Sequence, residues 1–199
     1  EDKTLLREEL TPQQAMCMLH FLKSRNVLRG VYIDGLGHMS REDFSEIEAV
    51  AASPATAALM RRSYQTDEDL DAVTAQHTSV QKIIAFFRNP DDKQATIREI
   101  TARFPGYAVS SSLGNNIEIN AKNATKGSAL CFLCEKIGVP IGQCMAFGDG
   151  TNDYSMLRAA GFGVAMGNAS EEVQSCADAV TETNEEDGVA RMIERVLEL

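Results

Sequence analysis

The residues best suited to chemistry in this 199-residue chain lie between positions 149 and 153. The apolar run 144–147 precedes them and is long enough to form a buried parallel strand. Ligands bind beyond the carboxyl ends of such strands, so Asp149 is expected in a ligand crevice. Asp149 and Asp153 supply hard oxygens that suit Mg²⁺. Asn152 or Asp153 is expected to cap the next helix, whose free N–H groups favour an anion. The stretch therefore predicts a metal beside a phosphate.

A lysine lies upstream, in the segment 123–127, directly before a helical pattern of apolar residues. Beside a metal-carboxylate site, Lys126 could offset negative charge on a phosphoryl group and on an attacking carboxylate. A lysine before a helix is by itself a weak signal, and a surface lysine is the ordinary alternative. It is the order of Lys126 and Asp149 along the chain that indicates a shared site.

These features belong to a longer ordered series of motifs, and through it the chain resembles the haloacid dehalogenase-like (HAD) superfamily. Within that superfamily it is most similar to the Cof-type phosphatases of sugar phosphates and related small metabolites. The series consists of Ile117 to Asn120, Lys126-Gly127, Ala146 to Asp153, Met156-Leu157, Ala159 to Gly161, Val164 to Ala169 and Glu186 to Ala190.

The resemblance implies a role for each matching residue. Lys126 matches the lysine that stabilises the phosphate, and Asp149 matches the acid that binds Mg²⁺. Asn152 and Asp153 match the supporting pair, and Asp153 is placed with Asp149 at the metal. The implied reaction transfers a phosphoryl group from a monoester to an aspartate, and water then hydrolyses the aspartyl-phosphate.

The family's nucleophilic aspartate belongs to an Asp-x-Asp motif, and the sequence has no good match to it. Val31 to Leu36 is an apolar run that reaches Asp34, but Leu36 stands where the second aspartate would be. Asp69-Leu70-Asp71 has the spacing but no preceding buried strand, and we interpret it as an acidic helical turn capped by Thr66 or Asp67. The family's serine or threonine motif has no evident counterpart either.

Chain order accounts for the gap, because Cof-type proteins place these two motifs before a mobile cap domain and the lysine and acidic motifs after it. We therefore expect a fragment that begins at the cap. The expected fold class is α/β, with an α+β cap domain over residues 1–121 and the C-terminal half of a HAD-like Rossmannoid parallel-sheet core over residues 122–199.

The hydrophobic pattern predicts the elements of both parts. In the first part, we expect an opening strand at 3–6 and a hairpin at 30–39 with Gly35 and Gly37 at its turn. The other predicted elements of this part are helices at 15–21, 41–52, 68–76 and 92–104 and strands at 82–87, 107–111 and 117–120. The predicted elements of the second part are helices at 127–137, 152–160, 169–176 and from 187, and strands at 143–147, 162–166 and 178–181.

Composition narrows the class of protein further. The net charge of −10 disfavours binding to nucleic acid or anionic membranes, and there is no apolar run long enough for a membrane helix. The five cysteines are expected to be reduced. Cys131 and Cys134 form a CxxC pattern inside a predicted helix, where core packing is favoured over metal or redox use. We expect a cytoplasmic protein.

Two functions remain open from the sequence. The first is a Mg²⁺-dependent phosphatase of small phosphorylated metabolites such as sugar phosphates, in which the 199 residues alone are inactive because the nucleophile lies outside them. A phosphoryl mutase is a variant of it. The alternative is a non-catalytic, degenerate binding or interaction module in which Asp149 only caps a helix. An unpaired core edge could also support a dimer.

Overall fold

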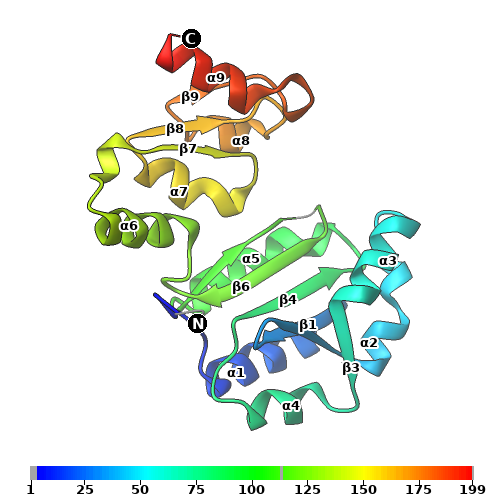
Figure 1. Ribbon diagram of the computed structural model, residues 1–199. Coiled ribbons are helices and arrows are strands. Elements are labelled where there is room, and N and C mark those ends of the chain that lie inside the picture. Colours follow the sequence, from blue (N-terminus) through cyan, green and yellow to red (C-terminus); the bar gives the residue numbers. More distant parts are fainter. Residues whose placement is uncertain (1–3, 113, 199) are drawn as a thin grey trace. The chain divides into compact units, whose positions relative to one another are not determined.

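Two separate β-sheets organise the part of the chain that the computed structural model describes, residues 4–112 and 114–198. Each sheet belongs to one of two units, Glu1–Ala124 and Thr125–Leu199 (Figure 1). The sequence predicts this boundary after residue 121. Both units mix helices and strands, and the sheet of the second unit is parallel, so the predicted α/β fold class is confirmed.

The first unit is built on a six-stranded sheet with the order β3-β2-β1-β4-β6-β5. All neighbouring strands are antiparallel except β2 and β3, which are parallel. Its elements in chain order are α1 (Pro12–Lys23), β1 (Val27–Ile33), β2 (Leu36–Ser40), α2 (Arg41–Ser45), the short 3-10 helix η1 (Ile47–Ala49), α3 (Pro54–Ser63), β3 (Tyr64–Asp67), α4 (Leu70–Gln76), β4 (Lys82–Phe87), α5 (Asp91–Arg103), β5 (Tyr107–Ser110) and β6 (Asn116–Ala121).

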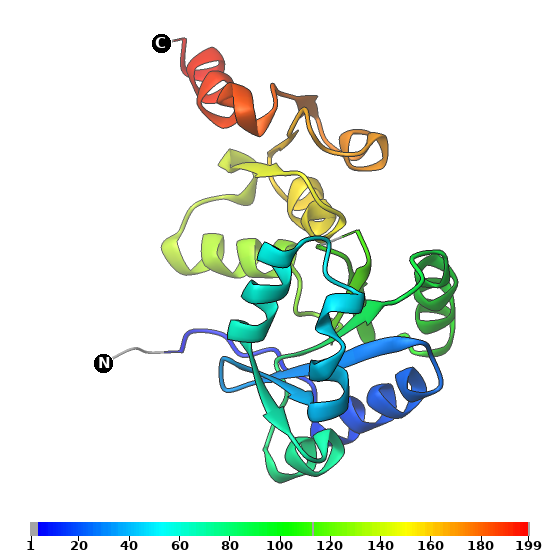
Figure 2. The ribbon, with the colours of Figure 1, turned by 90° about the vertical axis from the view of Figure 1, so that its right-hand side faces the viewer.

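Both faces of this sheet carry a hydrophobic core, because side chains alternate between the faces of a strand. In β4, Ile83, Ala85 and Phe87 join a core with residues of α1, α4 and α5. Ile84 and Phe86 point to the other face and pack with residues of η1 and α3. Figures 1 and 2 show α2 and α3 on the opposite side of the sheet from α1 and α5.

The hairpin between β1 and β2 turns one residue earlier than predicted. Asp34 and Gly35 occupy the turn with φ values of 50° and 82°, as expected for the turn type that matches strand twist. Gly37 lies in β2 instead, where a Cβ atom would come within 2.5 Å of the Ser63 carbonyl oxygen. The glycine at 37 therefore permits close packing of β2 against the β3 segment.

Two of the elements expected in this unit are wrong. An opening strand was expected at 3–6, but residues 4–6 form no strand, and residue 3 lies outside the described residues. Further along the chain, Leu10 forms an isolated antiparallel bridge with Val80. The predicted helix 41–52 breaks into α2 and η1. Helix α3 and strand β3 are not among the predicted elements, although Ser53 caps α3 and Pro54 follows at its first position, a standard helix-start signal.

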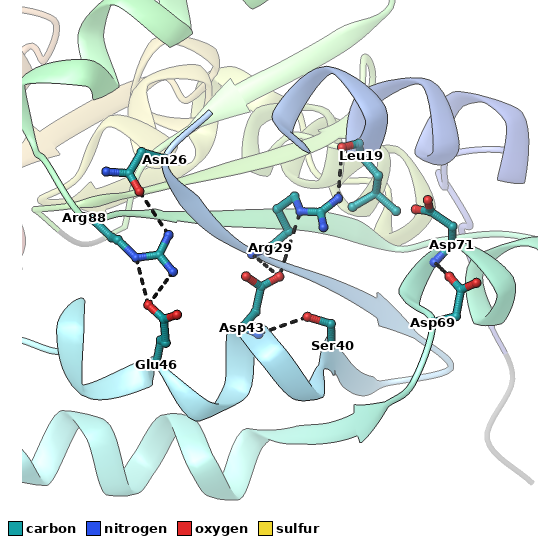
Figure 3. Close-up of polar contacts among 9 residues, drawn as sticks. All are labelled: Leu19, Asn26, Arg29, Ser40, Asp43, Glu46, Asp69, Asp71 and Arg88. Atoms are coloured by element: carbon teal, nitrogen blue, oxygen red, sulfur yellow. Dashed lines mark hydrogen bonds and ion pairs between the residues drawn. The ribbon is translucent and has the colours of Figure 1, made fainter. Parts of the chain in front are cut away.

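Asp69 itself caps α4, which corrects the prediction that Thr66 or Asp67 would do so. Its carboxylate accepts a hydrogen bond from the backbone N–H of Asp71 at 2.9 Å (Figure 3). It also accepts the backbone N–H of Ala72 at 3.1 Å. The Asp69-Leu70-Asp71 triplet therefore has a local structural role, as the helix-turn interpretation expected.

A buried polar cluster ties α2 to β1, and Figure 3 shows it. Asp43 is buried, and its carboxylate accepts the backbone N–H of Arg29 at 3.3 Å and lies 3.9 Å from the Arg29 guanidinium. Desolvation raises the pKa of Asp43, although Arg29 and Ser40 oppose that shift. The contribution of this carboxyl group to stability therefore falls as the pH rises above the unfolded value of about 3.8.

Replacing Asp43 by alanine should lower the free energy of unfolding by about 3 kcal/mol, because it leaves the partly buried guanidinium of Arg29 with the Leu19 carbonyl but without a carboxylate. Urea unfolding followed by circular dichroism measures the effect. Glu46→Ala is the matched control: it breaks a half-exposed pair with Arg88 and should cost less than about 1 kcal/mol. Equal costs for the two variants would contradict this account of the cluster.

The second unit repeats strand and helix around a three-stranded parallel sheet with the order β7-β8-β9. Its elements in chain order are α6 (Lys126–Ile137), η2 (Ile141–Gln143), β7 (Met145–Gly148), η3 (Thr151–Asp153), α7 (Tyr154–Ala159), β8 (Phe162–Ala165), α8 (Glu171–Gln174), β9 (Ala179–Val180), η4 (Asn184–Glu186) and α9 (Gly188–Leu197). Its core is small and centres on Leu157, Ala165 and Val173. Among the described residues, β7 pairs only with β8, on one side.

Candidate active site

Three elements of the second unit position the predicted site residues: the start of α6, the end of β7 and the 3-10 helix η3. Thr125 caps α6 by accepting a hydrogen bond from the backbone N–H of Ser128, so Lys126 becomes the first helical residue. Strand β7 ends at Gly148, directly before Asp149. The predicted site residues therefore lie at the carboxyl end of a parallel strand and at the amino end of a helix, both within the second unit.

The structure brings Lys126 and Asp153 together. The Lys126 ammonium donates a hydrogen bond to Oδ1 of Asp153, whose side chain is 5% exposed, whereas that of Lys126 is 49% exposed. The other oxygen, Oδ2, accepts the backbone N–H groups of Asp149 and Gly150, each at 3.0 Å. A single buried carboxylate therefore fixes both the lysine and the loop that carries Asp149.

This arrangement corrects the prediction that Asn152 or Asp153 caps the helix after β7. Residues Thr151–Asp153 form η3, and α7 begins without a side-chain cap. The Asp153 carboxylate points back toward the end of β7 because two backbone N–H groups of the loop and the Lys126 ammonium group all donate hydrogen bonds to it. Hydrogen bonds that involve a charged group are stronger than neutral ones, so these three contacts hold the carboxylate in this position.

Glycines make room for these contacts at two places. A Cβ atom on Gly148 would lie 2.4 Å from the Cβ of Asp153, and one on Gly127 would lie 2.3 Å from the Ser155 carbonyl oxygen. The backbone N–H of Gly127 also donates to the Ser155 hydroxyl at 3.0 Å. Ser155 is not among the predicted site residues, and no motif in the chain singles it out.

Replacing Gly148 by alanine should lower the free energy of unfolding by about 2 kcal/mol or more, because the added methyl group forces the buried side chain of Asp153 to move. Gly142→Ala is the control, since a Cβ atom there meets no atom within 4 Å. Thermal unfolding of both variants measures the difference. If Gly148→Ala is as stable as Gly142→Ala, the packing of Asp153 against β7 is wrong.

Asp149 is exposed at the end of β7, in contrast to Asp153. Its Oδ2 accepts a long hydrogen bond, 3.4 Å, from the side-chain amide of Asn168, and Oδ1 of Asn168 accepts the backbone N–H of Asn184. Asn168 follows β8 at the same edge of the sheet. The motif series contained it without assigning it a role, and its position after the neighbouring parallel strand was the available signal.

Asn152 lies in η3 and is half-buried. Its Oδ1 is so close to Gly150 that a Cβ atom on that glycine would lie 2.7 Å away. Asn152 thus shapes the same loop that holds Asp149.

Asp149 is the residue of this loop whose carboxylate could hold a divalent cation. The exposed carboxylate of Asp149 offers hard oxygen atoms, as Mg²⁺ prefers, and Mg²⁺ usually keeps several waters and binds one or two carboxylates. Both oxygens of Asp153 already accept hydrogen bonds. Within the described residues there is no group of three or more His, Cys, Asp or Glu side chains suited to hold a metal.

Tyr154 follows Asp153 directly but does not suit the role of a base. Desolvation, reinforced by Glu172, raises the pKa of the phenol to about 12. The hydroxyl group therefore stays protonated at neutral pH.

A comparison with protein-family models matches residues 1–193 to a family described as haloacid dehalogenase-like hydrolase. Phosphatase YwpJ of Bacillus subtilis is 51% identical over 87 residues, which make up 44% of this chain and 30% of that protein. A phosphoglycolate phosphatase of Pyrobaculum neutrophilum is 31% identical over 171 residues, or 83% of this chain and 67% of that protein.

Solved structures agree with these sequence matches. A haloacid dehalogenase-like hydrolase from B. subtilis superposes with a TM-score of 0.79 at 29% identity, covering 94% of this chain and 72% of that one. The matches to the first curated relatives span about a third of those relatives' length, from 30% to 41%.

Proposed function

The chain belongs to the family of haloacid dehalogenase-like hydrolases, and on that premise we propose that it is part of a Mg²⁺-dependent phosphatase of small phosphorylated metabolites such as sugar phosphates. The observation that carries the proposal is the buried Asp153 carboxylate, which holds the ammonium of Lys126 and the loop of Asp149 at once.

Each residue of this cluster has one part in the proposal. Lys126, half-exposed, directs its positive charge at a phosphoryl oxygen and stabilises the charge that develops during transfer. Asp153 positions Lys126 and the loop. Asn152 supports the loop, and Asp149 presents its carboxylate to the metal, oriented by Asn168.

Mg²⁺ would be held by Asp149 together with water and the substrate phosphate. A metal in this place neutralises phosphoryl charge and orients the reacting group. The sequence also predicts Asp153 as a metal ligand. In the present geometry we assign Asp153 to positioning, since Lys126 and two backbone N–H groups already occupy its oxygens.

The nucleophilic aspartate is proposed to come from a segment that these 199 residues do not include. Its two closest mimics have other local roles: Asp34 occupies a hairpin turn with φ of 50°, and Asp69 caps α4. The 199 residues alone are accordingly proposed to be inactive. The first unit is proposed as the cap that selects the substrate, and a cytoplasmic location remains part of the proposal.

The open edge of β7 is the proposed place for a further strand or a second copy. Unpaired strand edges attract other strands, and apolar side chains on one face of α9, Val189, Ile193 and Val196, are exposed in the same unit. A dimer of the 199-residue chain through this edge would be seen by light scattering.

None of the helices in the described ranges has the length and hydrophobicity that a membrane-spanning segment needs.

The test is phosphate release by the whole protein that contains this sequence, with and without Mg²⁺. Metal-dependent release from phosphomonoesters supports the proposal. A whole protein that releases no phosphate from any of a broad set of such esters would favour the binding-module alternative.

A further inference from the structure

Two cysteine side chains of the second unit lie in contact, and they are not the pair that the sequence pattern singled out. Cys134 lies in the last turn of α6, and Cys144 follows η2 and leads into β7. Their Sγ atoms are 3.2 Å apart. Cys131, the other half of the CxxC pattern, is exposed on α6.

The backbone on both sides of this contact is held in place. Helix α6 ends at Gly138, which has φ of 71°, and the backbone N–H of Val139 returns to the carbonyl oxygen of Cys134 at 3.0 Å. The N–H of Cys144 donates to the carbonyl of Ile141 at 3.1 Å. These hydrogen bonds fix the loop between α6 and β7, so the two thiol groups are held next to one another.

The two thiols differ in their access to solvent. Cys134 is 4% exposed, whereas Cys144 is half-buried. The hydrogen bond with Cys144 and, second, desolvation raise the pKa of the Cys134 thiol. Cys144 is thus the thiol that an outside oxidant reaches first, and Cys134 is the neighbour that can react with the product.

We propose that Cys134 and Cys144 are a peroxide-sensitive pair that forms a reversible disulfide and clamps the C-terminal turn of α6 to the start of β7. The Cys144 thiolate attacks one oxygen of hydrogen peroxide, becomes a sulfenic acid, and releases hydroxide that takes up a proton. Cys134, losing its proton, attacks the sulfenic sulfur and expels a second hydroxide as water. Two thiols and one peroxide give one disulfide and two waters.

The clamp joins the two elements that carry the candidate site, at the ends away from it. Lys126 opens α6 and Asp149 follows β7, whereas Cys134 and Cys144 lie at the opposite end of each element. A disulfide across this short loop restricts the unfolded chain, so the oxidised protein should melt about 5 °C higher. The inference does not depend on the phosphatase proposal.

The experiment treats the full chain with one equivalent of hydrogen peroxide and maps disulfides by peptide mass spectrometry, before and after dithiothreitol. We expect a Cys134–Cys144 crosslink with loss of two hydrogens, reversed by the thiol, in the wild type and in Cys131→Ser. The crosslink should be absent in Cys144→Ser.

The control Cys131→Ser changes an exposed thiol on the same helix. Wild-type protein that circular dichroism shows to be folded, and that yields no Cys134–Cys144 crosslink, overturns the proposal. A crosslink that forms in the wild type but not in Cys131→Ser also overturns the proposal, because the oxidation would then require the thiol of Cys131. Mapping the wild type decides the matter even if a variant fails to fold.

Discussion

Replacing Lys126 by alanine in the whole protein should lower kcat/KM for phosphomonoester hydrolysis about a hundred- to a thousandfold. The ammonium group is the positive charge that the structure holds next to the Asp149 loop, through the shared carboxylate of Asp153. Its loss removes stabilisation of the charge that builds up on the phosphoryl oxygens. The loss should therefore appear in kcat as well as in KM.

The control for this variant is Lys122→Ala, which removes an exposed lysine just before α6. It should retain wild-type kinetics. The Lys126→Ala variant also leaves the buried Asp153 carboxylate with fewer hydrogen-bond partners, which could destabilise the fold. Circular dichroism of Lys126→Ala therefore shows whether a loss of activity comes from unfolding. A folded Lys126→Ala enzyme with kcat/KM within threefold of the wild type would remove Lys126 from the site.

Asp149→Asn should abolish most of the metal response, with activity at saturating Mg²⁺ about a thousandfold lower than in the wild type. The amide keeps the shape of the side chain but lacks the charge that attracts a divalent cation. Asp149 is exposed and has one long hydrogen bond, from Asn168, so the substitution disturbs little else. Initial rates over a Mg²⁺ titration measure the effect.

Glu171→Gln provides the matched comparison, because it neutralises another exposed carboxylate of the same unit, in the first turn of α8. Its Mg²⁺ titration should superimpose on that of the wild type. If Asp149→Asn and Glu171→Gln give the same titration curve, Asp149 does not bind the metal, and the proposed metal site at the end of β7 is wrong.

The sequence predicted best the elements whose pattern is local and strongly apolar. Strand Lys82–Phe87 was predicted at its observed bounds. Five of its six residues are buried, and such an apolar run can be recognised in the sequence without knowing which strands pair with it. Helix α6 was predicted within one residue, since its pattern ends at a glycine with positive φ. The order of helix and strand in the second unit followed in the same way.

What the sequence did not predict depends on contacts between distant residues. Strand β3 was missed because Tyr64–Asp67 is short and polar, and only its pairing with β2 makes it a strand. Asp153 was one of two residues expected to cap a helix, and was also a predicted metal ligand. Instead, Lys126, 27 residues away, bonds its carboxylate. Contacts of Asn168 with Asp149 and of Cys144 with Cys134 arise from neighbouring elements, and no local motif reports them.

The most direct measurement is the rate of phosphate release from a panel of phosphomonoesters by the whole protein, before chelation, after chelation, and after Mg²⁺ is restored. The account predicts turnover that disappears on chelation and returns with Mg²⁺, and that is lost in Asp149→Asn. Turnover that survives chelation, or that Asp149→Asn leaves intact, would contradict the claim that Lys126, Asp149 and Asp153 form a metal-dependent phosphoryl site.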